Sequence, residues 1–222
     1  ATFMILGEIC TWACQYCAVT TGRPNALDTD EPARLASTVV KLGLKYCVIT
    51  SVTREDIPDG GASVFAECIT RIHDALPECK VEVLIPDFLG VDDDLKTVLD
   101  AGPEVLNHNI ETTRSMFRQV RPKGDYDRSL RLLRRASEMA SNIPTKSGIM
   151  VGLGETMEDI KQTMADLLEA NCQLLTIGQY LRPTPIHWKL DRFYTPQEFQ
   201  ELADIGMAMG FRHVASGPLV RS

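Results

Sequence analysis

Short runs of β-forming residues alternate with longer helical segments along nearly the whole chain, and this alternation limits the possible folds more than any other feature. Apolar and β-branched runs predict strands at residues 2–6, 46–52, 81–85, 104–110, 145–151, 174–180 and 211–215. Helices are predicted between them, at residues 30–42, 61–75, 92–101, 126–141, 157–170 and 196–208. Because strands that alternate with helices pair in parallel through right-handed crossovers, we expect an α/β fold.

The length of the chain limits how many such units it can contain. The 222 residues hold about six to seven strand–helix units, whereas a complete eight-unit barrel usually needs about 250 residues. We therefore expect an incomplete barrel or an open α/β sheet. The sequence contains no repeat, low-complexity tract or linker, so one domain over residues 1–222 is predicted.

Two helices begin with recognisable start signals. Thr195, Pro196 and Glu198 have the spacing of a capping box with proline in the first turn. The three aspartates at 92–94 offer caps and also suit the positive end of the helix dipole. Both signals predict helix boundaries to within a residue or two.

Polar and glycine-rich segments follow the predicted strands at their carboxyl ends. Examples are residues 53–62, 107–111 and 152–156. Parallel α/β folds build their active sites at this edge of the sheet. One such segment would be ordinary, but their presence after every strand predicts an enzyme with a ligand bound there.

Cys10, Cys14 and Cys17 follow the first predicted strand with the spacing C-x3-C-x2-C. Thiolates select zinc, copper(I) or iron–sulfur clusters. A structural zinc site needs four ligands, and no fourth Cys or His stands at zinc spacing. A four-iron cluster held by three cysteines leaves one iron open to a substrate. A zinc site or an incidental group of thiols is the alternative.

Composition narrows the remaining possibilities. The net charge of −7 argues against nucleic acid as a partner, and no run of 18 apolar residues is available to span a membrane. Seven cysteines, four of them scattered, do not form a disulfide framework and favour a reducing compartment. We expect those four, Cys47, Cys68, Cys79 and Cys172, to be buried apolar residues.

The cysteine motif after the first strand of a partial barrel resembles the radical S-adenosylmethionine (radical SAM) superfamily. More of the chain resembles the lipoyl synthase family within it. The segments that carry this resemblance are VITSVTREDIPDGGA, VEVLIPDFLG, NHNIET, VRPKGDYDRSL, TKSGIMVGLGET, LTIGQYLRPT and VASGPLVRS. Together they cover essentially the whole chain, and the resemblance implies a partial (β/α)6-type TIM barrel.

The resemblance implies a sulfurtransferase that works through radical chemistry. Cys10, Cys14 and Cys17 would hold a [4Fe-4S] cluster whose open iron binds S-adenosylmethionine (SAM). Cleavage of SAM gives a radical that abstracts hydrogen from an octanoyl chain, and sulfur is inserted at C6 and C8 to form the lipoyl group. No catalytic residue is implied beyond the cluster-bound SAM.

The resemblance also implies a set of contacts to SAM. They are at Gly60, Gly61, Asn109, Glu111, Arg121 and Gly152. The two adjacent glycines would lie near the methionine amino group, and Arg121 would pair with a carboxylate. A structural salt bridge is the alternative for Arg121, and hydrogen bonding within the loop is the alternative for Asn109 and Glu111.

Three departures from the family pattern carry expectations of their own. The family's second, auxiliary [4Fe-4S] cluster uses a C-x4-C-x5-C set that is absent here, and the sequence ends at Arg221-Ser222 within the family's serine motif. We expect a piece of a longer protein that binds SAM without inserting sulfur. Trp12 replaces the arginine usual in the family, which alters a local ion pair.

The implied partners are an octanoylated lipoyl carrier domain or a glycine-cleavage H-type protein, and a reductant such as flavodoxin or ferredoxin. The implied location is the cytoplasm, or an organelle matrix or stroma. Residues 114–135 hold eight basic and two acidic side chains, either a solvated helix face or a docking patch for an acidic carrier.

Other interpretations remain open at this point. A second radical SAM sulfur-inserting enzyme, similar to biotin synthase, is one alternative, and a non-catalytic iron–sulfur or zinc module is another. His108 invites a role as general base, although radical hydrogen abstraction needs none, so we expect a hydrogen-bonded structural histidine. His187 belongs to a substrate loop or is structural.

Overall fold

The computed structural model describes residues 1–221. Ser222, part of the predicted serine motif, lies outside the described residues. The chain divides into two compact units. The first contains Ala1–Trp12, Val19–Asn107 and Arg135–Ile143, and the second contains Ala13–Ala18, His108–Arg134 and the chain from Pro144 onward. A single domain over residues 1–222 stays a prediction.

The first unit is built on four parallel strands in the order β1-β4-β5-β6. They are β1 (Thr2–Ile5), β4 (Tyr46–Ser51), β5 (Lys80–Leu84) and β6 (Val105–Asn107). Phe3 lies opposite Ile49, and Ile49 lies opposite Val83. Two short strands, β2 (Ile9–Cys10) and β3 (Thr20–Thr21), form a separate pair.

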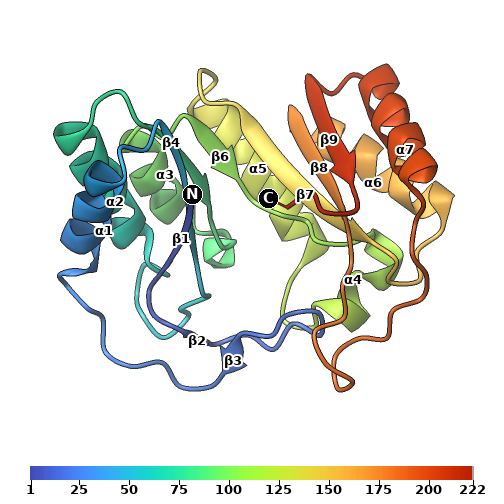
Figure 1. The fold of residues 1–222 in the computed structure, drawn as a ribbon, viewed down its shortest axis with the longest axis horizontal. Helices are drawn as coiled ribbons and strands as arrows, with labels where there is room; N and C mark the ends of the chain where they lie inside the picture. The colour runs from blue at the N-terminus through green and yellow to red at the C-terminus, as the bar shows by residue number, and fades with distance from the viewer. Residues whose placement is uncertain (222) are drawn as a thin grey trace. The chain divides into compact units, whose positions relative to one another are not determined.

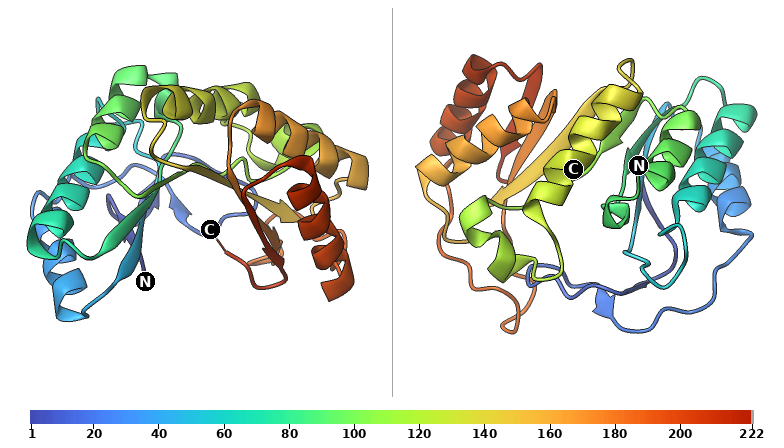
Figure 2. Two further views of the ribbon diagram at one scale, coloured as in Figure 1. Left: turned by 90° about the horizontal axis from the view of Figure 1, so that it is seen from above. Right: turned by 180° about the vertical axis from the view of Figure 1, so that it is seen from behind.

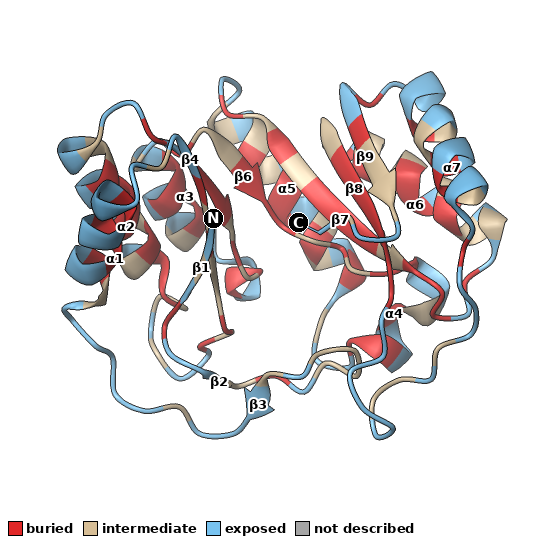
Figure 3. Ribbon diagram, in the orientation of Figure 1, coloured by how far each residue is buried: buried red, intermediate tan, exposed pale blue. Residues whose placement is uncertain are grey.

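Three helices link these strands and cover one face of the sheet (Figures 1 and 2). They are α1 (Glu31–Lys41), α2 (Ala62–Ala75) and α3 (Asp92–Asp100). Val39, Phe65, Ile69 and Val98 are buried completely on their inner faces, while the outer faces are exposed (Figure 3). This division follows from apolar residues at helical spacing.

The second unit contains three parallel strands in the order β7-β8-β9. They are β7 (Thr145–Val151), β8 (Leu174–Gln179) and β9 (His213–Gly217). Its helices include α4 (Arg114–Val120), α6 (Met157–Glu169) and α7 (Pro196–Met209). Helix α5 (Tyr126–Met139) begins in this unit.

The core of the second unit lies between its strands and helices. Ile149 and Ile177 from the strands pack with Met164 of α6 and Phe199 of α7. Strand β8 is almost wholly buried, as expected for a central strand of a parallel sheet. The four scattered cysteines are buried, which confirms that prediction; they are Cys47, Cys68, Cys79 and Cys172.

The observed elements differ from the predicted ones in a few places. Helix α4 was not predicted. The predicted strand 104–110 is shorter in the structure, where β6 covers only Val105–Asn107. The predicted aspartate caps of α3 are wrong, since Val91 occupies the cap position and makes no side-chain cap. The capping box of α7 is confirmed, with Glu198 N donating to Thr195 Oγ1 at 3.2 Å.

The segment after β5 contains a short 3-10 helix, η1 (Phe88–Gly90). Phe88, Leu89 and Gly90 all have positive φ. Asp87 stabilises this turn by accepting a hydrogen bond from Leu89 N at 3.1 Å. Within residues 1–221, no helix combines the length and the apolar character needed to cross a bilayer.

Candidate functional site

Cys10 ends strand β2 and is held by backbone amides of the first unit. Its sulfur accepts hydrogen bonds from Thr53 N at 3.3 Å and from Trp12 N at 3.4 Å. Thr11 N also donates to Thr53 O at 3.0 Å, which ties the cysteine segment to the loop after β4. These contacts fix the position of the Cys10 sulfur.

Cys14 and Cys17 lie on a tight turn in the second unit. Cys17 N donates to Cys14 O at 3.1 Å, and Gln15 N donates to Val120 O at 2.8 Å. Both cysteines are partly exposed, and neither forms a disulfide with another residue that the structure describes. Burial raises the pKa of the Cys14 thiol to about 11, against the opposing effect of Arg121. A bound metal would therefore have to displace the proton from this thiol.

A pocket of about 150 Å³ lies at the carboxyl ends of β7 and β8 in the same unit. Its polar walls come from segments far apart in the chain. Tyr16 belongs to the cysteine turn, Asn109 and Glu111 follow residue 107, and Thr176 and Gln179 belong to β8. The predicted residues Asn109 and Glu111 therefore lie together, at the edge of the strands where a ligand site was expected.

Glu111 is fixed by the backbone of β7. Its amide donates to Gly148 O at 2.9 Å, and its carbonyl accepts from Met150 N at 2.8 Å. Burial raises the pKa of its carboxyl group, while Arg121 and hydrogen bonds from Asn109 and Tyr16 act in the opposite direction. Burial also raises the pKa of Tyr16 well above its usual value, with Glu111 adding to the effect.

Arg121 is buried at the end of α4, with 8% of its surface exposed. It donates through Nη1 to the backbone carbonyl of Asn109 at 3.1 Å and lies 5.8 Å from the centre of the Phe117 ring. Its charge acts on Glu111 and Cys14. The backbone hydrogen bond of Arg121 positions the loop that carries Asn109, and its role toward a ligand stays a prediction.

The side-chain oxygen of Asn109 is the polar atom of this pocket that points to a ligand. Oδ1 is buried and accepts no hydrogen bond, although a buried acceptor normally has a partner. A ligand group that donates a hydrogen bond, such as a hydroxyl or an amine, would satisfy it. On this observation, the residues present fit a polar cofactor such as SAM.

Gly152 follows β7 at φ 98° and is required by the protein's own packing. A Cβ atom there would lie 2.4 Å from Gln179 Nε2 and 2.5 Å from Arg192 O. Gly152 N donates to the carboxylate of Glu155 at 2.7 Å, as Leu153 N does at 2.8 Å. Glu155, which accepts from both amides of this loop, was not singled out in the sequence. The available signal was an acid directly after Gly154 in the Gly-Leu-Gly segment.

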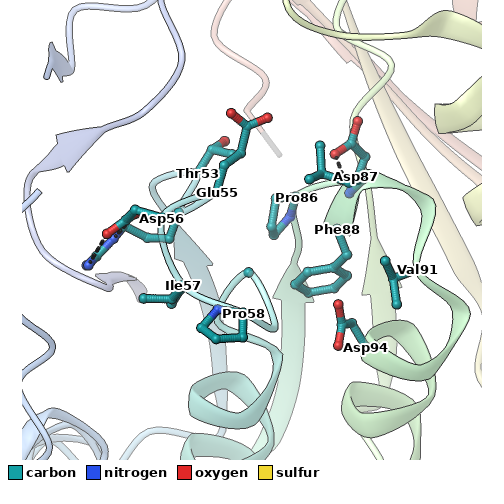
Figure 4. Close-up of a pocket in the computed structure, with 13 residues that line it drawn as sticks. Thr53, Glu55, Asp56, Ile57, Pro58, Pro86, Asp87, Phe88, Val91 and Asp94 are labelled. Carbon is teal, nitrogen blue, oxygen red and sulfur yellow. Dashed lines mark hydrogen bonds and ion pairs between the residues drawn. The ribbon is translucent and has the colours of Figure 1, made fainter. Parts of the chain in front are cut away.

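Gly60 and Gly61 precede α2 in the first unit and also face protein atoms. A Cβ at Gly61 would lie 2.2 Å from Leu6 Cδ1, and one at Gly60 would lie 3.0 Å from Phe88 Cδ1. Gly60 lines a pocket of about 280 Å³. In Figure 4 the walls of this pocket include Ile57 from the loop after β4 and Phe88 from the segment after β5.

Arg54 supports the loop that carries these glycines. It is 3% exposed, forms an ion pair with Asp56 at 2.8 Å, and donates to the carbonyls of Leu6 at 2.9 Å and Asn25 at 3.0 Å. The sequence did not single out Arg54. Its place directly after a buried strand was the available signal.

The predicted site residues divide between the units. Cys10, Gly60 and Gly61 lie in the first, and the rest lie in the second, namely Cys14, Cys17, Asn109, Glu111, Arg121 and Gly152. In residues 1–221, no three His, Cys, Asp or Glu side chains lie close enough together to hold a single metal ion. The roles assigned to these residues remain predictions.

Comparison with known proteins establishes the family. The model of the radical SAM superfamily matches residues 4–167. Over all 222 residues the chain is 57% identical to the lipoyl synthase of Rubrobacter xylanophilus and covers 69% of that protein. The chain belongs to the lipoyl synthase family. It is also 54% identical to the lipoyl synthase of Halalkalibacterium halodurans, of which it covers 73%.

Solved structures agree on the fold of this lipoyl synthase family member. HydG, a maturase of [FeFe]-hydrogenase, matches with a TM-score of 0.76 at 18% identity over 96% of this chain and 50% of HydG. SuiB of Streptococcus suis, bound to S-adenosylmethionine, matches with a TM-score of 0.72 at 12% identity over 99% of this chain and 50% of SuiB. The predicted α/β fold of a radical SAM enzyme is confirmed.

His108 has a hydrogen-bonded position in the second unit. It is 1% exposed, and its Nε2 lies 3.0 Å from Ser129 Oγ. Burial and this bond fit the expected structural role. Trp12, expected to depart from the family pattern, is 3% exposed and donates through Nε1 to Glu55 at 2.7 Å.

The basic segment 114–135 is partly neutralised by acids of the chain itself. Arg114 pairs with Asp127 at 2.8 Å, and Arg135 pairs with Asp92 at 2.9 Å and with Glu138 at 2.6 Å. The segment therefore offers less positive charge than its composition suggests.

Proposed function

We propose that this chain carries the radical-forming part of lipoyl synthase, and that its substrate is an octanoyl group attached to a lipoyl carrier domain or an H-type protein. The observation that carries the proposal is the 57% identity to a lipoyl synthase over every residue of the chain. Hydrogen would be removed at C6 and C8, where sulfur is then inserted.

Cys10, Cys14 and Cys17 are the proposed ligands of a [4Fe-4S] cluster, because C-x3-C-x2-C supplies three thiolates on one short segment. When bound, the cluster and SAM supply the electron and the carbon radical that the hydrogen abstraction needs. The amides of Trp12 and Thr53 would hold the Cys10 sulfur in position.

The pocket of the second unit is the proposed place for the polar groups of SAM. The Oδ1 atom of Asn109 would accept a hydrogen bond from SAM, and Arg121 would hold the Asn109 loop through its backbone carbonyl. Glu111 would orient the amide of Asn109 and the hydroxyl of Tyr16. No protein acid or base is needed for the hydrogen abstraction itself.

The remaining partners are proposals drawn from the family. A reductant such as flavodoxin or ferredoxin would deliver the electron, in the cytoplasm or in an organelle matrix or stroma. A second, auxiliary [4Fe-4S] cluster would be the sulfur source. The C-x4-C-x5-C motif that the family uses for this cluster does not occur in residues 1–222.

Anaerobic reconstitution with iron and sulfide tests this function. We expect about four irons per chain, an electron paramagnetic resonance spectrum that SAM changes, and 5'-deoxyadenosine formation under dithionite. Cys14→Ala should abolish all three signals, whereas Cys172→Ala, at a buried cysteine outside the motif, should keep them. A Cys14→Ala protein that retains the cluster spectrum would refute the ligand assignment, and a spectrum that SAM leaves unchanged would refute the SAM site.

A further inference from the structure

The segment between β8 and α7 contacts the cysteine turn of the second unit at two points. Nε2 of His187 lies 3.0 Å from the carbonyl oxygen of Cys17, and Trp188 N donates to Gln15 O at 2.7 Å. His187 and Cys17 are 170 residues apart in the sequence. Segment 182–190 is therefore hydrogen-bonded to the backbone of the turn that carries Cys14 and Cys17.

This segment is itself anchored to the body of the unit. The indole nitrogen of Trp188 donates to Leu153 O at 2.8 Å, and the carbonyl of Trp188 accepts from Tyr180 Oη at 2.7 Å. Trp188 also packs against the apolar group of Val120, Leu153 and Tyr180. Because Trp188 is fixed at three backbone or side-chain points, it can hold the Gln15 carbonyl in one place.

Both ring nitrogens of His187 have partners. The carbonyl oxygen of Cys17 can only accept, so Nε2 is the donor of this bond. Nδ1 lies 2.8 Å from Thr184 Oγ1. The two contacts together orient the imidazole ring toward the cysteine turn.

We infer that His187 is a positioning residue for Cys17, acting through the Cys17 carbonyl, with Thr184 setting the orientation of the imidazole ring. The inference rests on the proposed function in so far as Cys14 and Cys17 hold a cluster. Groups that hydrogen-bond to the ligating residues, without touching the metal, orient those ligands and so affect the affinity for the metal. His187 therefore limits the motion of the turn before metal arrives and slows the loss of metal afterwards.

Hydrogen exchange in the metal-free chain tests, independently of any cluster, whether His187 restrains the turn at residues 13–18. His187→Ala should speed amide exchange in residues 13–18, where the amides of Gln15 and Cys17 are bonded. His187→Gln, whose amide nitrogen can replace Nε2 as the donor, should restore slow exchange. His213→Ala, at an exposed histidine of β9, is the matched control and should leave residues 13–18 unchanged.

Iron release from the reconstituted chain gives the second measurement. With a chelator in excess, His187→Ala should lose iron about 10-fold faster than the parent chain, and Thr184→Val should show a smaller change in the same direction. His187→Gln should return the rate to within about twofold, which corresponds to less than half a kcal/mol.

The outcomes separate this inference from the proposed function. Unchanged exchange in residues 13–18 of His187→Ala would overturn the inference, as would a His187→Gln protein that behaves like His187→Ala. If the parent chain takes up no iron, the proposed function fails, while the exchange measurement still decides whether His187 holds the turn.

Discussion

Glu111 combines an unusual backbone conformation with a desolvated carboxyl group. A left-handed residue other than glycine costs about 1–2 kcal/mol, and Glu111 adopts φ 71°. The two backbone hydrogen bonds to β7 hold it there. Such strain persists where the surrounding structure demands it, and here it directs the Asn109 and Glu111 side chains into one pocket.

Asn109→Ala tests the ligand role of that pocket. We expect the Kd for SAM to rise about 10-fold, the effect of losing roughly 1.4 kcal/mol, because the variant lacks the acceptor Oδ1. Iron content should not change, since Asn109 is not a proposed ligand. Calorimetric titration of the reconstituted chain measures the affinity, and an unchanged Kd would contradict the assignment.

Gly152→Ala tests whether the glycine is required by packing. We expect a loss of about 2–4 kcal/mol in the free energy of unfolding, because both backbone strain and overpacking act there. Gly43→Ala is the matched control: Gly43 also has positive φ, at 57°, but no atom lies within 4 Å of the position that a Cβ would take. Its cost should be only about 1 kcal/mol, and equal losses in urea denaturation would argue against the clash.

Helices α6 and α7 begin with the same local device. Thr156 and Asp159 form a capping box at α6, and Thr195 and Glu198 form one at α7. Each box satisfies two amides that the helix leaves without an internal partner. At α7, Arg192 also pairs with Glu198 at 2.7 Å. Glu198 therefore links the first turn of the helix both to the cap residue and to the segment before it.

Thr195→Ala should destabilise the chain by about 1 kcal/mol, the usual cost of removing a hydroxyl cap. Thr38→Ala is a matched control, since Thr38 lies inside α1 and its hydroxyl donates to Arg34 O of the same helix. Urea denaturation measures both. A Thr195→Ala chain as stable as Thr38→Ala would contradict the role of the cap.

The same box predicts a dependence on pH. The Thr195 amide and then Arg192 lower the pKa of Glu198. A carboxyl group with a lowered folded pKa stabilises the fold above its unfolded pKa of about 4.3, and this stabilisation is lost as pH falls through the lower folded value. Glu198→Gln should therefore be less stable than the parent chain at pH 7, with the difference closing at acid pH. A difference that stays constant across the pH series would contradict this.

The sequence predicted regular elements well and contacts between distant segments poorly. The period of apolar residues sufficed for α2, which was predicted at residues 61–75 and found at Ala62–Ala75. Helix α4 escaped notice because seven residues are too few to show a helical period. Arg54 was missed because two of its partners, the carbonyls of Leu6 and Asn25, lie on distant segments. Glu155 binds amides of its own loop and also the hydroxyl of the distant Tyr194. The link between His187 and Cys17 likewise joins segments whose proximity only the folded chain defines.

At the scale of the whole molecule, ligand binding and stability are linked. A ligand that binds only the folded state adds about 2.7 kcal/mol when present at 100 times its Kd. We therefore expect SAM to raise the melting temperature of the reconstituted chain by several degrees. Cys14→Ala should show no such rise, because it lacks the proposed open iron. Differential scanning calorimetry measures the melting temperature of both proteins. An equal rise in the two would show that SAM binds without the cluster.

Gly178 lines the pocket of the second unit at a position where the surrounding atoms leave no space for a Cβ atom. A Cβ at Gly178 would lie 2.4 Å from Val220 O, as close as the contact found at Gly152. An engineer who reshapes this pocket should therefore leave Gly178 unchanged, because any side chain there would force the backbone of Val220 to move. Useful diversity has to start from side chains that already border the cavity, such as Thr176 and Leu181.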